Sequence, residues 1–67
     1  MNLRINGKVV QVPEEVTTIS NLIMHFNINH SVVIAELNGK ILDKENHPLS
    51  VVEDGDKVEL VQFVGGG

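Results

Sequence analysis

Residues 54–67, DGDKVELVQFVGGG, contain the clearest strand pattern in the sequence. Asp54-Gly55-Asp56 is typical of a turn, and a strand is predicted to follow it from Lys57 to Val64. Neighbouring residues of a strand point to opposite faces of the sheet. One face is therefore expected to carry Val58, Leu60 and Val64, and the other to carry Glu59, Val61 and Phe63.

A β-hairpin is predicted at the start of the chain, over residues 1–12, because apolar and polar residues alternate in both halves of this segment. Asn6-Gly7 separates the halves and favours a tight type I′ turn, which requires positive φ at both central residues. Pro13 is expected to end the second strand, because proline has no N–H to donate to the ladder.

One helix is predicted after this hairpin. Thr17 or Thr18 can cap its start, and Asn27 or Asn29 is expected to end it in the left-handed conformation. Its apolar residues follow the spacing i, i+3, i+4, i+7, which places them on a single helical face. These residues are Ile19, Leu22, Ile23 and Phe26.

A nearly continuous apolar run from Val32 to Leu37 predicts a strand that is covered on both faces or lies at the centre of a sheet. Asn38-Gly39 repeats the tight-turn signal, and a short return strand begins at Ile41-Leu42. Residues 43–56 are loop-like, with room for a single helical turn. This order predicts an α+β domain over residues 1–64, with one helix packed on one face of a mixed sheet of four to five strands. The last strand is expected beside the first and parallel to it.

Composition excludes several classes of function. A chain of 67 residues has room for one core, which nearly excludes a conventional enzyme cleft. The absence of cysteine rules out a disulfide framework, a thiol nucleophile and a cysteine-ligated zinc site. A net charge of −4 with scattered cations argues against binding to nucleic acid. Neither a signal peptide nor a membrane span is recognisable, so a cytoplasmic protein is expected.

The three terminal glycines have no turn to form, since they follow the last predicted strand. One interpretation is an exposed tail without a role. The other is a flexible reactive tail, residues 65–67, in which Gly65 and Gly66 enter a narrow channel and extend over roughly 10 Å. The reactive group would then be the α-carboxylate of Gly67, which ATP activates as an acyl adenylate. A sulfur nucleophile or a lysine can displace AMP, and a partner enzyme must supply the ATP site.

Other candidate groups are weaker. Val61 and Phe63 are expected to face away from the helix just before the tail, either as ordinary surface residues or, together with Val64, as a partner-binding patch. The histidines His25, His30 and His47 lack metal-ligand spacing and are expected to be solvated or to cap helices. The acidic run over residues 53–59 lacks the calcium-loop pattern, so no metal site is expected, although it could meet a basic patch on a partner.

The closing stretch also resembles the carboxyl end of the ThiS family of sulfur carriers. In that family a DGD-x-VE-(I/L)-V run leads into VGGG or AGG, as in residues 54–67 of this chain. The Asn6-Gly7-Lys8 hairpin, the helix and the Val32–Gly39 segment match the layout of the family, and the likeness covers the whole chain. The resemblance implies a ubiquitin-like β-grasp fold.

The resemblance further implies a cycle in thiamine biosynthesis. The Gly67 carboxylate would be adenylated by an E1-like enzyme, ThiF, which uses MgATP, and a sulfur donor protein would then supply the sulfur of a thiocarboxylate. Thiazole synthase, ThiG, would use that sulfur to build the thiazole ring. The chain would bind no cofactor of its own and would not itself be an enzyme.

Other functions would suit the same fold. The small, MoaD-like subunit of molybdopterin synthase is usually longer and often has Pro-Pro near its end, where this chain has Gln62-Phe63-Val64. A carrier for another sulfur pathway, or a modifier joined to lysines, would have the same tail. A non-catalytic β-grasp module that binds proteins would use its sheet instead.

Overall fold

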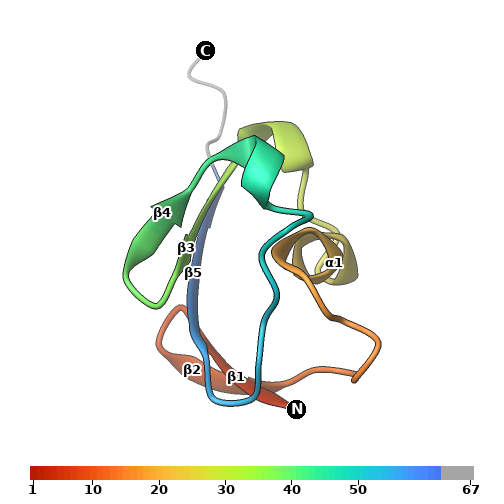
Figure 1. Cartoon of the computed structure of the whole chain (residues 1–67). Coiled ribbons are helices and arrows are strands. Elements are labelled where there is room, and N and C mark those ends of the chain that lie inside the picture. Colours follow the sequence, from red (N-terminus) through yellow and green to blue (C-terminus); the bar gives the residue numbers. More distant parts are fainter. Residues whose placement is uncertain (63–67) are drawn as a thin grey trace.

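A five-stranded mixed sheet dominates the computed structural model, which describes residues 1–62 (Figure 1). The strand order is β2-β1-β5-β3-β4, with β5 parallel to β1 and antiparallel to β3. The predicted α+β architecture and the parallel pairing of the first and last strands are therefore confirmed. The strands are β1 (Asn2–Ile5), β2 (Lys8–Gln11), β3 (Val33–Leu37), β4 (Lys40–Leu42) and β5 (Lys57–Gln62).

Two Asn-Gly turns close the hairpins as the sequence predicts. Asn6 and Gly7 have φ values of 50° and 85° between β1 and β2, and Asn38 and Gly39 have values of 51° and 88° between β3 and β4. Positive φ at both central residues is the requirement of a type I′ turn, which suits the twist of the adjoining strands. Each turn thereby fixes the register of its hairpin.

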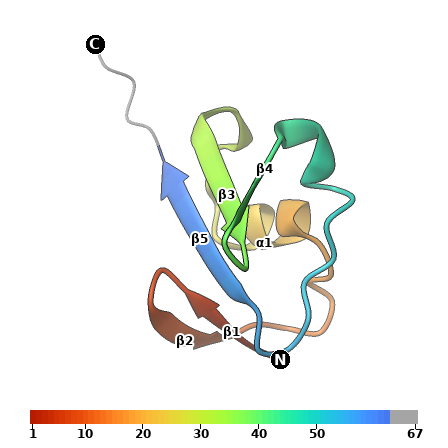
Figure 2. The same ribbon diagram turned by 60° about the vertical axis from the view of Figure 1, so that its left-hand side comes forward.

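The helix α1 (Ile19–His25) covers one face of the sheet (Figure 2). Thr18 caps it, because its side-chain oxygen accepts from the N–H of Asn21 at 3.1 Å, while the Asn21 side chain accepts from the N–H of Thr18 at 3.2 Å. Asn27 follows the helix with φ 57° and ends it, as predicted. Phe26 is a correction, because it occupies the C-cap and is 36% exposed rather than part of the buried face.

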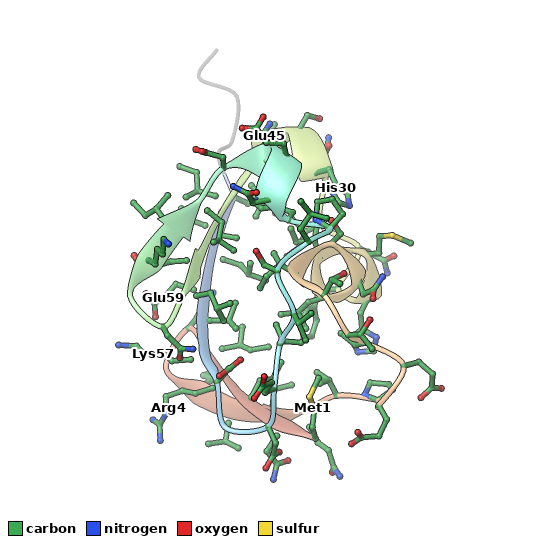
Figure 3. The ribbon with its side chains drawn as sticks, in the orientation of Figure 1. Met1, Arg4, His30, Glu45, Lys57 and Glu59 are labelled. Carbon is green, nitrogen blue, oxygen red and sulfur yellow. The ribbon has the colours of Figure 1, made fainter. Side chains whose placement is uncertain are left out.

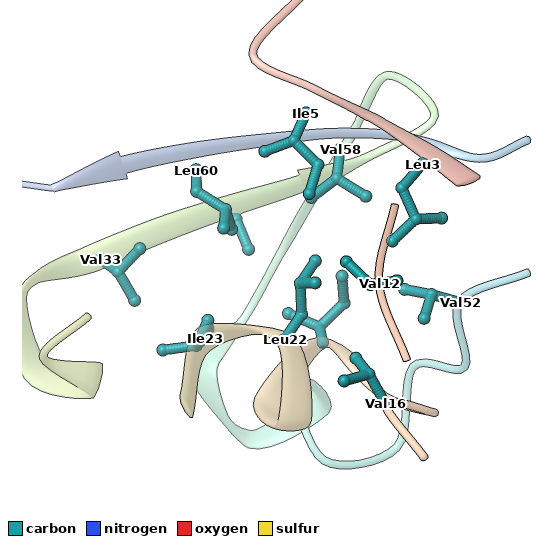
Figure 4. Packing of buried hydrophobic residues seen from close by; sticks show 12 residues of the cluster. Leu3, Ile5, Val12, Val16, Leu22, Ile23, Val33, Val52, Val58 and Leu60 are labelled. Atoms are coloured by element: carbon teal, nitrogen blue, oxygen red, sulfur yellow. The ribbon is translucent and has the colours of Figure 1, made fainter. Parts of the chain in front are cut away.

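A single hydrophobic core lies between α1 and the sheet (Figure 4). The helix contributes Ile19, Leu22 and Ile23, all of which are fully buried. Segments outside the regular elements close the sides of this core. The buried residues from the rest of the chain are Leu3, Ile5, Val12, Val16, Val33, Ala35, Val52, Val58 and Leu60.

The strand β3 differs in part from its prediction. It has a strand on each side, but β5 holds the centre of the sheet and only one face of β3 is covered. Val33 and Ala35 are buried, whereas Ile34 is 37% exposed. The reason is that α1 covers one face of the sheet only, so alternate residues of the apolar run face away from the core.

Two single helical turns lie in the connections, η1 (His30–Val32) and η2 (Lys44–Asn46), and the second confirms the turn predicted within residues 43–56. His47 is the C-cap of η2, where its N–H donates to the carbonyl of Lys44 at 3.1 Å, so the capping alternative of its prediction is confirmed. Its side chain is 2% exposed, so the solvated alternative is wrong. Its carbonyl accepts from the N–H of Ser20 at 3.1 Å, which holds the loop against the start of α1. None of the helices within residues 1–62 is long and apolar enough to cross a membrane.

Candidate functional site

The central strand β5 leads to the predicted reactive terminus. It runs from the edge of the molecule near the N-terminus to the opposite end of the sheet (Figure 2). The structure describes this strand as far as Gln62. The tail predictions for Gly65, Gly66 and Gly67, and the partner-contact predictions for Phe63 and Val64, lie outside the described residues.

The two neighbours of β5 hold it over different lengths. On one side β3 pairs with it from Leu37↔Val58 to Val33↔Gln62. On the other side β1 pairs with it only at Arg4↔Lys57 and Ile5↔Val58, because the chain then turns into β2. The part of β5 that approaches the tail is therefore paired with a strand on the β3 side alone.

A side chain extends the shorter of these two ladders. The carboxamide of Asn6 donates from Nδ2 to the carbonyl of Leu60 at 3.1 Å and accepts from the N–H of Leu60 at its Oδ1 at 2.9 Å. Sequence reasoning interpreted Asn6 only as a turn residue. Its distance from Leu60 in the sequence left no local signal for this contact.

The face of the sheet opposite α1 is called the outer face here, and Val61 lies on it as predicted. Val61 is 52% exposed and pairs with Ile34 on β3. Ile41, which is 66% exposed, extends this group on β4, because it pairs with Glu36 on the same face. Val61, Ile34 and Ile41 are called the apolar patch below. Sequence reasoning missed Ile34 and Ile41, whose exposure follows from the register of β3.

Charged side chains share the outer face with the apolar patch. Glu36 and Glu59 are cross-strand partners beside it. Arg4 and Lys57 lie farther toward the start of β5, and Figure 3 shows both on the side of the sheet away from α1. The outer face therefore changes from basic residues near the start of β5, through acidic residues, to apolar residues near its end.

The acidic run serves the turn before β5. Asp54 Oδ1 accepts from the N–H of Asn2 at 2.6 Å. Asp56 accepts from the Asn38 side chain at 3.1 Å and from the N–H of Glu53 at 2.8 Å. These carboxylates hold the turn against both hairpins. Within residues 1–62, no three His, Cys, Asp or Glu side chains come together in a way that could hold a metal ion.

Comparison with known proteins identifies the family. The chain matches the model of the ThiS family over residues 3–67. The chain belongs to the ThiS family. It is 37% identical over 65 residues to the sulfur carrier protein ThiS of Bacillus subtilis (strain 168), covering 97% of this chain and 98% of that protein.

Two further comparisons bear on the ThiS assignment. The crystal structure of the thiamine biosynthesis protein ThiS from Geobacter metallireducens matches with a TM-score of 0.84 and 36% identity, and the match covers 100% of both chains. A thiazole synthase of Paramagnetospirillum magneticum is 34% identical over 67 residues, which are 100% of this chain and 20% of that protein. The predicted ubiquitin-like β-grasp fold is confirmed, and the chain is a ThiS sulfur carrier of thiamine biosynthesis.

Proposed function

We propose that this ThiS sulfur carrier holds its sulfur on the terminal carboxylate of Gly67. The observation that carries the proposal is the family match, which extends through residue 67 and so includes the Gly-Gly-Gly end. The 67 residues contain no cysteine, so no thiol side chain of this chain can carry the sulfur. Residues 1–64 would form the recognised domain and residues 65–67 the reactive tail.

The chemistry would run in two steps. First, a carboxylate oxygen of Gly67 attacks the α-phosphorus of MgATP, which forms an acyl adenylate and releases pyrophosphate. Sulfide then attacks the acyl carbon, the bond to AMP breaks, and a thiocarboxylate remains. A persulfide on a donor protein would instead give an acyl disulfide, which a thiol must cleave to release the thiocarboxylate. Gly65 and Gly66 suit the channel that this requires, because they have no Cβ atoms.

The chain would act as the substrate of other enzymes rather than as an enzyme. We assign the adenylation, with its MgATP, to a ThiF-like enzyme, the sulfur to a donor protein, and the use of the sulfur to a ThiG-like thiazole synthase. The likeness to a segment of a thiazole synthase supports the last partner. Because adenylation consumes ATP, we expect the cycle in the cytoplasm.

We assign the docking of these enzymes to the apolar patch, together with Phe63 and Val64. A partner must hold the domain while it receives the Gly67 carboxylate. Gly67 is the sixth residue after Val61, and six extended residues span at most about 20 Å. A dock at Val61 therefore lies within reach of the reaction. Glu36 and Glu59, which flank the patch, suit a partner with basic residues around its own apolar surface.

Pyrophosphate exchange tests the proposal. A ThiF-type enzyme is incubated with ATP, labelled pyrophosphate and the chain, and label entering ATP reports reversible formation of the acyl adenylate. We expect exchange with the full chain and none with a matched chain that ends at Gly65. Exchange that does not depend on the chain, or that persists with the shortened chain, would exclude Gly67 as the site. The chain would then be a binding module.

A further inference from the structure

The two strands β1 and β5 form a regular parallel ladder up to Asn6. The N–H of Arg4 donates to the carbonyl of Asp56 at 2.9 Å, and the N–H of Asn6 donates to the carbonyl of Val58 at 3.0 Å. Each step advances two residues on both strands. The next step would join Leu60 to the backbone of residues 6 and 8, but the tight turn at Asn6-Gly7 carries the backbone away from β5.

The Asn6 side chain supplies this missing step. A carboxamide has one carbonyl and one amino group, so it can replace a peptide group as both acceptor and donor. Its two contacts with Leu60, at 2.9 Å and 3.1 Å, do so. Leu60 therefore has hydrogen bonds on the side where β1 has ended. As a result, β5 is hydrogen-bonded on both edges for two residues beyond the point where its pairing with β1 ends.

These contacts matter because Leu60 lies close to the predicted reactive terminus. Gly67 is the seventh residue after Leu60. A pivot of about 10° at Leu60 would move Gln62, the last described residue, which lies two residues and about 7 Å farther along β5, by roughly 1 Å. Reaction at the carboxylate requires the reacting atoms to approach within about 3.5 Å. The direction in which β5 leaves the sheet is thus a determinant of the reaction geometry.

We propose that Asn6 is a positioning residue for the reaction at Gly67, because its carboxamide fixes the direction in which β5 leaves the sheet. The assignment rests on the proposed function. Asn6 acts through Leu60 and touches no reacting atom. Docking through the apolar patch is independent of this contact, since the pairing of Val61 with Ile34 on β3 holds the patch in place.

The second Asn-Gly turn provides a matched control. Asn38 has φ 51°, is followed by Gly39, and also binds β5 with its side chain, accepting from the N–H of Lys57 at 2.9 Å. Lys57 begins β5, at the end of the strand far from the tail. The same substitution in the two turns therefore removes a comparable contact from opposite ends of β5. Glycine suits both sites, because it adopts positive φ without strain.

The test compares Asn6→Gly with Asn38→Gly in three measurements: thermal unfolding, hydrogen exchange of single amides by NMR, and kcat and KM for adenylation by a ThiF-type enzyme with MgATP. We expect both variants to fold with similar losses in Tm. Of the two variants, only Asn6→Gly should raise the rate of amide hydrogen exchange at Leu60, and it should leave the rate at Val58 unchanged. It should lower kcat on the order of tenfold, the loss expected from misplacing a reacting group by less than 1 Å, with KM within about twofold.

A third variant, Asn6→Asp, keeps an oxygen that accepts from the N–H of Leu60 but cannot donate to its carbonyl when ionised. An intermediate kcat for this variant supports the assignment, even where Asn6→Gly does not fold. An equal loss of kcat in Asn6→Gly and Asn38→Gly overturns it, as does an unchanged kcat in Asn6→Gly or a loss confined to KM. If the wild-type chain is not adenylated, the proposed function itself fails. If the wild-type chain is adenylated and Asn6→Gly has an unchanged kcat, only the assignment of Asn6 fails.

Discussion

A charge placed in the apolar patch should separate docking from folding. Val61→Asp puts a carboxylate on the outer face of β5, where Val61 is 52% exposed. Val9→Asp is the matched control, because Val9 is 66% exposed and lies opposite Arg4 on the same face. Val9 belongs to the edge strand β2, whereas Val61 lies six residues from the predicted reactive carboxylate.

The expected loss of docking affinity follows from the exposure of Val61. Complete burial of a valine side chain stabilises by about 2 kcal/mol, so covering its exposed half contributes about 1 kcal/mol to docking. A carboxylate trapped there without a partner would cost about 2 kcal/mol more, and Glu36 and Glu59 on the same face would add repulsion. A total of about 3 kcal/mol corresponds to a loss of affinity of roughly 100-fold.

Adenylation kinetics with a ThiF-type enzyme provide the assay. Val61→Asp should raise KM by roughly 100-fold, and Val9→Asp should change it by less than about threefold. Urea denaturation should show losses of at most about 1 kcal/mol for either variant, since both side chains are already largely exposed in the folded state. Equal effects of the two substitutions on KM would refute the docking assignment.

Three further predictions concern the tail, its neighbourhood and the helix. Deleting Gly66-Gly67 should abolish adenylation while leaving Tm nearly unchanged, because the buried core residues that the structure describes lie between Leu3 and Leu60; a large fall in Tm would show that the tail is structural. Phe63→Ala should weaken enzyme binding, measured by calorimetry, more than it weakens folding, and the reverse order would place Phe63 in the core. Thr18→Ala should destabilise the fold by about 1 kcal/mol in urea, whereas Thr18→Ser should keep the cap and the stability.

Local sequence signals predicted most of the fold. Both Asn-Gly turns, the Thr18 cap and the left-handed Asn27 depend on residues close together in the chain, and all are found. The alternation in the last strand placed Val58 and Leu60 in the core and Val61 outside it. These features were predictable because their physical causes act within a few residues.

The remaining features depend on contacts between distant segments. His47 is buried because the loop that carries it packs against α1, and nothing in the local sequence distinguishes it from a solvated histidine. The exposure of Ile34 depends on the helix covering only one face of the sheet. The same holds for the candidate site, where the contact of Asn6 with Leu60 depends on the packing of the first hairpin beside the last strand.

The central claim, that sulfur is carried on Gly67, is tested most directly by thiol-reactive alkylation. The chain is incubated with a ThiF-type enzyme, MgATP and sulfide, then alkylated, digested and mapped by mass spectrometry. Alkylation is needed because exchange of oxygen for sulfur adds nearly the same mass as oxidation of Met1 or Met24. The chain has no cysteine to react, so we predict one label, on the peptide that ends at Gly67. An unlabelled terminus, beside successful labelling of the Bacillus subtilis ThiS in the same mixture, would contradict the account.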